Sequence, residues 1–206
     1  MRLSSWGWIG GSELLIARLS QDRSLPGSIS EMTGTDATSS FRDRFTALFD
    51  ARFQRLYRYL DRLSGEPELA ADLAQEAFVR LYQRGSLPDA PDAWLITVAM
   101  NLFRNARSMQ TRRRRLLTVA RAEAVLADPA PSPAQVAMDV ASSTRVRAAL
   151  DQLPERERQL LLLRAEGYSY REISAALEVN DASIGTLLAR AKRAFREAYD
   201  DESNAS

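Results

Sequence analysis

Apolar residues recur at steps of three and four along most of the chain, a spacing that predicts amphipathic α-helices. The first predicted helix covers residues 41–63 and ends before Gly65 and Pro67, which both interrupt helices. The second begins at Pro67, and a loop over residues 84–91 separates it from a third that begins near Asp92. The pattern therefore predicts an all-α protein.

Residues 153–195 carry the local signals of three further, closely spaced helices. Gly167 is suited to end the first of them, because glycine readily adopts the left-handed conformation that closes a helix. Ser169 and Glu172 have the spacing of a capping box at the start of a short second helix. Asn180 is suited to cap the third. This order predicts a helix-turn-helix, a unit that places its second helix in the major groove of DNA.

The last predicted helix has one polar and one apolar side. Ser183, Thr186 and Arg190 fall on roughly one side, away from Ile184 and Leu188. Hydroxyl and guanidinium groups suit base edges and phosphates, so DNA binding is favoured. The alternative is an ordinary helical hairpin with a solvated polar face. Further positive side chains nearby are Arg171, Lys192, Arg193 and Arg196.

A second concentration of positive charge lies on the third predicted helix, the one that begins near Asp92. Between Asn101 and Arg121 there are arginines but no acidic residue; they are Arg104, Arg107, Arg112, Arg113, Arg114, Arg115 and Arg121. A solvated helix face, the alternative, would normally mix acids with bases. The run therefore favours contacts with nucleic-acid phosphates.

Composition excludes several kinds of chemistry. The 206 residues include 28 basic and 27 acidic ones, with no cysteine and no histidine. Disulfides, thiolate nucleophiles, histidine bases and the usual zinc ligands are therefore absent, and we expect a cytoplasmic protein with no cofactor. No apolar run is long enough to span a membrane, so no membrane insertion is expected. Asp72 and Glu76 form one acidic pair, the only basis for a metal-dependent enzyme, and we expect neither a metal nor a catalytic residue.

The same pattern predicts two helical domains joined by a proline-rich linker. Abundant Ser, Gly and Thr between residues 20 and 40 predict disorder there. The alternative is a short regulatory arm that carries Trp6 and Trp8. The predicted segments are a disordered extension (1–40), a first helical domain (41–118), a flexible linker (119–142), a second helical domain with the helix-turn-helix (143–200) and a fraying tail (201–206).

Two stretches of the first domain resemble the promoter-melting domain of bacterial sigma factors: DLAQEAFVRLYQR (72–84) and DAWLITVAMNLFRNARS (92–108). The second domain, LDQLPERERQLLLLRAEGYSYREISAALEVNDASIGTLLARAKRAF (150–195), resembles their C-terminal promoter-binding domain. With only these two domains, in this order, the chain is similar to the extracytoplasmic-function group. The resemblance implies promoter-specific initiation with core RNA polymerase.

The resemblance also implies roles for individual residues. Those expected to bind the clamp helices of core polymerase are Asp72, Gln75, Glu76 and Phe78. Those expected to hold the single-stranded minus-ten element are Trp94, Asn101, Arg104, Asn105, Arg112 and Arg113. Those expected to read the double-stranded minus-thirty-five element are Arg171, Ser183, Thr186, Arg190 and Arg193. The polymerase flap is a further implied contact, and an anti-sigma factor is a partner that the family allows.

A transcriptional regulator without polymerase binding is the main rival hypothesis. It would explain the helix-turn-helix over residues 153–195. It would not explain the D-x-x-Q-E-x-F run that starts at Asp72, nor the arginine run that follows Asn101. Tight binding to core polymerase separates the two hypotheses.

Overall fold

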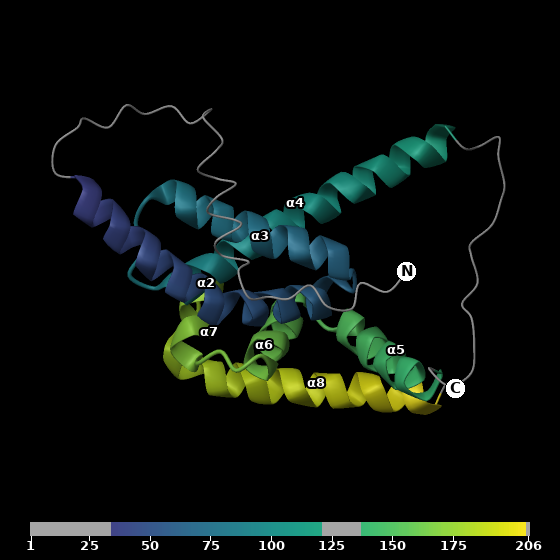
Figure 1. Cartoon of the computed structure of the whole chain (residues 1–206). Coiled ribbons are helices and arrows are strands. Elements are labelled where there is room, and N and C mark those ends of the chain that lie inside the picture. Colours follow the sequence, from purple (N-terminus) through teal and green to yellow (C-terminus); the bar gives the residue numbers. More distant parts are fainter. Residues whose placement is uncertain (1–33, 121–136, 205–206) are drawn as a thin grey trace. The chain divides into compact units, whose positions relative to one another are not determined.

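The computed structural model describes the backbone of residues 34–120 and 137–204 (Figure 1). Every element in these ranges is helical, which confirms the all-α prediction for this part of the chain. The elements are α2 (Gly34–Ser64), α3 (Pro67–Arg84), α4 (Pro91–Ala120), α5 (Ala137–Gln152), α6 (Glu155–Ala165), α7 (Tyr170–Leu177), the short 3₁₀ helix η1 (Asp181–Ser183) and α8 (Ile184–Asn204). The chain forms two compact units whose boundary lies between Leu95 and Ile96, inside α4.

In the first unit, α2 packs along α3 through a cluster of aromatic rings. Phe78 of α3 meets Phe49 of α2 edge to face, with ring centroids 4.9 Å apart. Phe45 and Phe53 surround the same ring at 6.2 and 5.8 Å. All four side chains are buried. Because each aromatic side chain removes a large apolar area from water, this cluster is the core that holds the two helices together.

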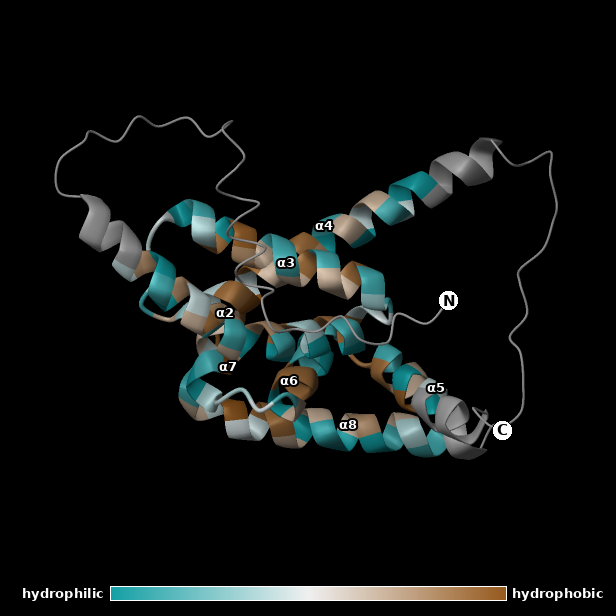
Figure 2. Ribbon diagram, in the orientation of Figure 1, coloured by the Kyte–Doolittle hydropathy of each residue, from teal (hydrophilic) through white to brown (hydrophobic). Residues whose placement is uncertain are grey.

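The ends of α3 follow from its local sequence. Pro67 occupies the first turn, where its missing N–H costs no hydrogen bond. Gly85 ends the helix with φ 72°, and its N–H donates to the carbonyl of Tyr82. The helix has an apolar and a polar side, and Figure 2 shows hydrophobic residues in brown interleaved with hydrophilic ones in teal along α3 and α8. The predicted start at Pro67 and end at the loop are confirmed.

The first turn of α4 is tied to α2 by a carboxylate. Asp92 accepts from Arg55 (Nη2–Oδ1 2.7 Å) and lies within 3.0 Å of Arg52 Nε. The Asp92 side chain is only 15% exposed, so its charge is satisfied by these two guanidinium groups rather than by water. These two ion pairs fix where the loop over residues 85–90 ends and α4 begins.

Three helix ends differ from the predicted ones. Helix α2 begins at Gly34 rather than at residue 41, so the expected disorder of residues 34–40 is wrong. Helix α5 begins at Ala137 rather than near residue 143, and α8 continues to Asn204 through the expected tail. No proline interrupts these segments, and extending a formed helix adds one hydrogen bond per residue ordered. Most of the predicted linker, 121–136, and the tryptophans of the extension lie outside the described residues.

In the second unit, α8 packs against α5, α6 and α7. Its buried residues include Ile184 and Leu188, and buried partners on the other helices include Leu160, Leu163 and Ile173. A second apolar cluster, formed by Ala149, Leu153 and Ala198, closes the far end of the unit with partly buried Leu161, Ala194, Phe195 and Tyr199 around it. This core holds the exposed side of α8 at the surface.

The predicted helix-turn-helix is confirmed in detail. Ser169 accepts from the N–H of Glu172, whose carboxylate accepts from the N–H of Ser169, so both halves of the capping box are present. Asn180 caps the next helix by accepting from the N–H of Ala182. Between the helices Glu178 has φ 53°, a left-handed conformation that costs a non-glycine residue about 1–2 kcal/mol. The turn between α7 and η1 therefore carries this local backbone cost.

Candidate nucleic-acid and protein interfaces

The polar face of α3 carries the first group of predicted site residues. Asp72 and Gln75 are exposed, and Glu76 is half-exposed. Glu76 binds Arg80 one turn later, with Nε–Oε1 2.9 Å, and both side chains are close to half exposed. A pair this exposed is worth little to the fold and exchanges easily for an arginine on a partner. The face therefore offers carboxylate and amide acceptors to a basic protein surface.

The structure corrects the place of Phe78 in this surface. Its side chain is 0% exposed and packs on Phe45 and Phe49. It cannot contact a partner while α2 and α3 remain packed. It stands four residues after buried Ala74 and three before buried Leu81, so it belongs to the apolar stripe of α3, which the core covers. Phe78 thus supports the polar face of α3 from inside the first unit.

The second group lies along α4. Asn101, Arg104 and Asn105 are exposed, whereas Trp94, near the start of the helix, is half-buried. Arg104 donates to Asn101 (Nη1–Oδ1 3.3 Å) and, within the second unit, to Glu155 (Nε–Oε1 3.1 Å). Both members of the pair with Glu155 are about half exposed, so the pair is weak and Arg104 can change partner. Amide and guanidinium donors at this spacing suit unpaired bases and phosphates.

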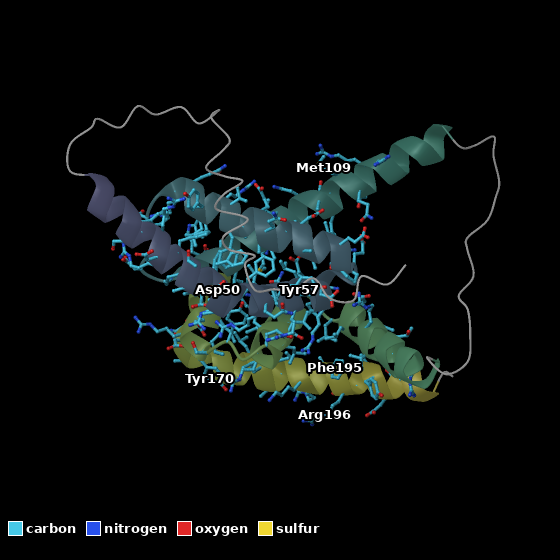
Figure 3. All side chains as sticks on the ribbon, in the orientation of Figure 1. Asp50, Tyr57, Met109, Tyr170, Phe195 and Arg196 are labelled. Atoms are coloured by element: carbon cyan, nitrogen blue, oxygen red, sulfur yellow. The ribbon has the colours of Figure 1, made fainter. Side chains whose placement is uncertain are left out.

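The arginine run continues along the same helix. Arg107, Arg112 and Arg113 are exposed, and Figure 3 shows the exposed Met109 on this stretch of α4. The side chains of Arg114 and Arg115 lie outside the described part of the structure. No acidic residue occurs in α4 after Asp92, so nothing on this helix neutralises the positive charge. Such a stretch attracts a phosphate backbone.

Replacing Arg112 and Arg113 by alanine is expected to lower the salt dependence of promoter binding. Each phosphate contact contributes about 0.7–0.9 to the slope of log affinity against log salt, so two lost contacts should lower it by about 1.4–1.8. The measurement is filter binding of the polymerase complex between low and moderate salt. The control R42A/R44A removes the same charge from exposed positions of α2 and should leave the slope unchanged. Equal slopes for wild type and R112A/R113A would place both arginines away from DNA.

The third group lies on α8, at the end of η1 directly before it, and at the start of α7. The residues there that are exposed are Arg171, Ser183, Thr186, Arg190 and Arg193. Ile184 and Leu188 are buried, so the predicted division of α8 into a polar and an apolar side is confirmed. Figure 3 shows Arg196 on the side of α8 that faces away from α6 in this view. The exposed face of α8 thus combines hydroxyl groups with positive charge.

Arg190 has a carboxylate partner that the sequence pattern did not indicate. Its Nε donates to Oε1 of Glu157 in the first turn of α6, at 2.8 Å. The Glu157 side chain is 11% exposed and that of Arg190 57%. In the sequence Glu157 fits a helix start and nothing more, because acids are common there. Only the packing of α6 against α8 brings the two residues together.

No metal site accompanies these surfaces in the described residues. Asp72 and Glu76 belong to no group of three or more acidic side chains that could hold a metal ion there. None of the described helices is long and apolar enough to cross a membrane. What the described surfaces offer is a set of acceptors on α3 and two basic, hydrogen-bonding faces on α4 and α8.

Two stretches of the chain match one class of transcription protein. Residues 48–115 match the family Sigma-70 region 2, and residues 143–195 match Sigma-70, region 4. The sigma factor EcfG of Rhodopseudomonas palustris, an ECF RNA polymerase sigma factor, is 34% identical over 166 residues, which are 76% of this chain and 82% of the relative. The chain therefore belongs to the ECF family of RNA polymerase sigma factors.

Other relatives differ in how much of their length is matched. The ECF sigma factor SigX of Bacillus subtilis is 27% identical over 161 residues, 75% of this chain and 83% of the relative. SigE of Mycolicibacterium smegmatis is 34% identical over 148 residues, 69% of this chain, but the chain spans only 56% of SigE. The chain thus covers about half the length of that relative.

A solved structure has the same fold. It is the co-crystal structure of the sigma factor RpoE in complex with the anti-sigma factor NepR from Bartonella quintana. The TM-score is 0.51 at 22% sequence identity, and the match covers 77% of this chain and 98% of the other. The arrangement of helices, rather than a particular function, is what the two chains share.

Proposed function

We propose that this chain binds core RNA polymerase and directs it to specific promoters. The observation that carries the proposal is the combination, in one chain, of an exposed acceptor face on α3 with basic faces on α4 and α8. Membership of the ECF sigma family supports the same conclusion. A promoter-binding regulator would need the α8 face, but it would have no use for the acceptors on α3.

The face of α3 is the proposed contact with core polymerase. Asp72, Gln75 and Glu76 present two carboxylates and an amide, which suit arginines on a pair of partner helices. Binding would replace the exposed Glu76–Arg80 pair by pairs across the interface. Desolvation at an interface makes such charge-assisted hydrogen bonds more selective than they are on a free surface.

The exposed stripe of α4 is the proposed site for the separated strand at the minus-ten element. A base inside a duplex hides its pairing edge, so a protein that reads it must hold it unpaired. Asn101 can donate and accept at a base edge, and Arg104 and Asn105 add donors beside it. Half-buried Trp94 provides an aromatic surface at the start of the same helix, and stacking on such a surface is worth about 1–3 kcal/mol per base. These gains would offset the cost of unstacking.

The exposed face of α8 is the proposed reader of the duplex at minus thirty-five. Ser183 and Thr186 lie near the N-terminal end of the helix, the end that contacts base edges in a helix-turn-helix. Arg171 lies at the start of α7, where phosphate contacts set the register of such a unit on DNA. Arg190 and Arg193 extend the positive face along the groove. The polymerase flap and an anti-sigma factor are further proposed partners. The chain is proposed to act in the cytoplasm and to have no catalytic residue of its own.

Transcription with purified core polymerase tests this function. Core polymerase free of other sigma factors is mixed with the full chain and with fragments of the source genome, and the 5′ ends of the transcripts are sequenced. The expected result is a set of start sites that share two upstream elements and that require the chain. Transcripts that do not depend on the chain, or specific DNA binding without any association with core polymerase, would contradict it and favour the regulator.

A further inference from the structure

Glu157 is a buried acid directly beneath the exposed face of α8. Its residue is 8% exposed, and its carboxylate accepts from Arg190 Nε at 2.8 Å. A buried carboxylate needs such a charge-assisted hydrogen bond, because burial without a partner would be costly. The packing around the buried acid therefore restricts its position, and the acid binds the Nε edge of the Arg190 guanidinium.

The contact does more than stabilise the packing of α6 against α8. The Arg190 side chain is 57% exposed, so part of its guanidinium lies at the surface beyond Glu157. What the contact changes is the freedom of Arg190, whose long side chain otherwise samples many rotamers. With Nε bound to Glu157, the terminal nitrogens Nη1 and Nη2 have no protein partner among the described residues. These two nitrogens can therefore donate two parallel hydrogen bonds, as the two prongs of a fork.

We infer that Glu157 is a positioning residue that holds the Arg190 guanidinium so that its terminal nitrogens read a guanine in the upstream promoter element. Arginine recognises guanine O6 and N7 with two parallel hydrogen bonds. Because Nε is already used, the end-on pair Nη1 and Nη2 is the fork that remains. The inference rests on the proposed function of α8, and it adds the base that is read and the residue that orients the reader.

The alternative is that Glu157 neutralises Arg190 and keeps it away from DNA. The proposal and this alternative predict different effects when the acid is removed. If the acid only neutralises, its removal frees a positive charge and strengthens binding to any DNA. If the acid orients the fork, its removal lowers the preference for guanine at one position and leaves the other positions as they were.

The test uses holoenzyme assembled from core polymerase and the full chain, and a pool of DNA duplexes with a randomised upstream window. Bound and unbound fragments are sequenced to obtain the base preference at each position. The variants are E157M, which keeps the side-chain volume without an acceptor, E157Q, which keeps an acceptor oxygen, and R190K, which keeps the charge without the fork. E197A is the charge control, since Glu197 is 70% exposed and lies 3.9 Å from Arg193.

Wild type is expected to prefer guanine at one position by about 5- to 150-fold, the range of a good bidentate contact. R190K and E157M should both reduce the preference at that position severalfold, whereas E157Q and E197A should retain it. Thermal melting of each variant checks the fold. Should E157M fail to fold, E157D, which keeps the charge but shortens the reach, should reduce the same preference.

Two results would overturn the inference alone. One is a folded E157M or E157D whose guanine preference equals that of wild type. The other is an equal loss at every position, which would show a general effect on the fold or charge. A wild-type holoenzyme that binds with no base preference in the upstream window would instead overturn the proposed reading by α8, and the inference with it.

Discussion

Replacing Glu76 by arginine is expected to weaken binding of the chain to core RNA polymerase at least about tenfold, which corresponds to about 1.4 kcal/mol. The substitution reverses a charge at the centre of the proposed acceptor face of α3, so partner arginines would be repelled rather than bound. The fold should persist. The lost pair with Arg80 and the new repulsion at i,i+4 should together cost no more than about 1 kcal/mol of stability.

The measurement is a titration of labelled chain with core polymerase, alongside thermal unfolding of each variant. Asp50→Arg is the matched control, because it makes the same charge change at an exposed position of α2, labelled in Figure 3. D50R should bind core polymerase as wild type does. Core binding by E76R at the wild-type affinity, or an equal loss in D50R, would show that α3 is not the polymerase interface.

Substitutions on α4 and α8 are expected to affect different steps of initiation. Arg190→Ala should weaken binding to duplex promoter by about 1–3 kcal/mol, the worth of a bidentate base contact. Asn101→Ala should leave duplex binding intact and reduce strand opening by up to about tenfold, since a hydrogen bond to an unpaired base is worth about 0.5–1.5 kcal/mol. The difference follows from which strand state each helix is proposed to hold.

Gel shift on duplex promoter measures the first step, and permanganate reactivity of unpaired thymines measures the second. A promoter with a pre-melted bubble should restore much of the activity of N101A and little of that of R190A. Gln54→Ala truncates an exposed amide on α2 and should change neither step. The proposed division of labour fails if both variants lose duplex binding equally and a bubble restores neither.

Local signals in the sequence were enough to predict most of the second unit. The capping box of Ser169 and Glu172, the Asn180 cap and the end of α6 before Gly167 all appear where predicted. Each depends on residues a few positions apart, and such short-range hydrogen bonds form whenever the chain turns there. The sequence likewise indicated which residues of α8 are exposed, because a 3.6-residue period separates them from Ile184 and Leu188.

Helix lengths were predicted less well, since polar residues extend a helix without changing its apolar pattern. Residues 34–40 have no apolar periodicity and yet belong to α2. The last residues before Asn204 likewise have none and belong to α8. Periodicity detects the part of a helix that packs against something. It does not detect turns that a helix gains by backbone hydrogen bonding alone.

The sequence by itself determined the fold class, the helix-turn-helix and the charged faces, because these depend on neighbours along the chain. Tertiary structure decided that Phe78 is core rather than interface, that Asp92 holds Arg52 and Arg55, and that Glu157 holds Arg190. Along the chain, Arg52 and Arg55 lie 40 and 37 positions from Asp92. Arg190 lies 33 positions from Glu157. No local pattern encodes such distances, since they arise only when packing of the apolar faces brings separate helices together.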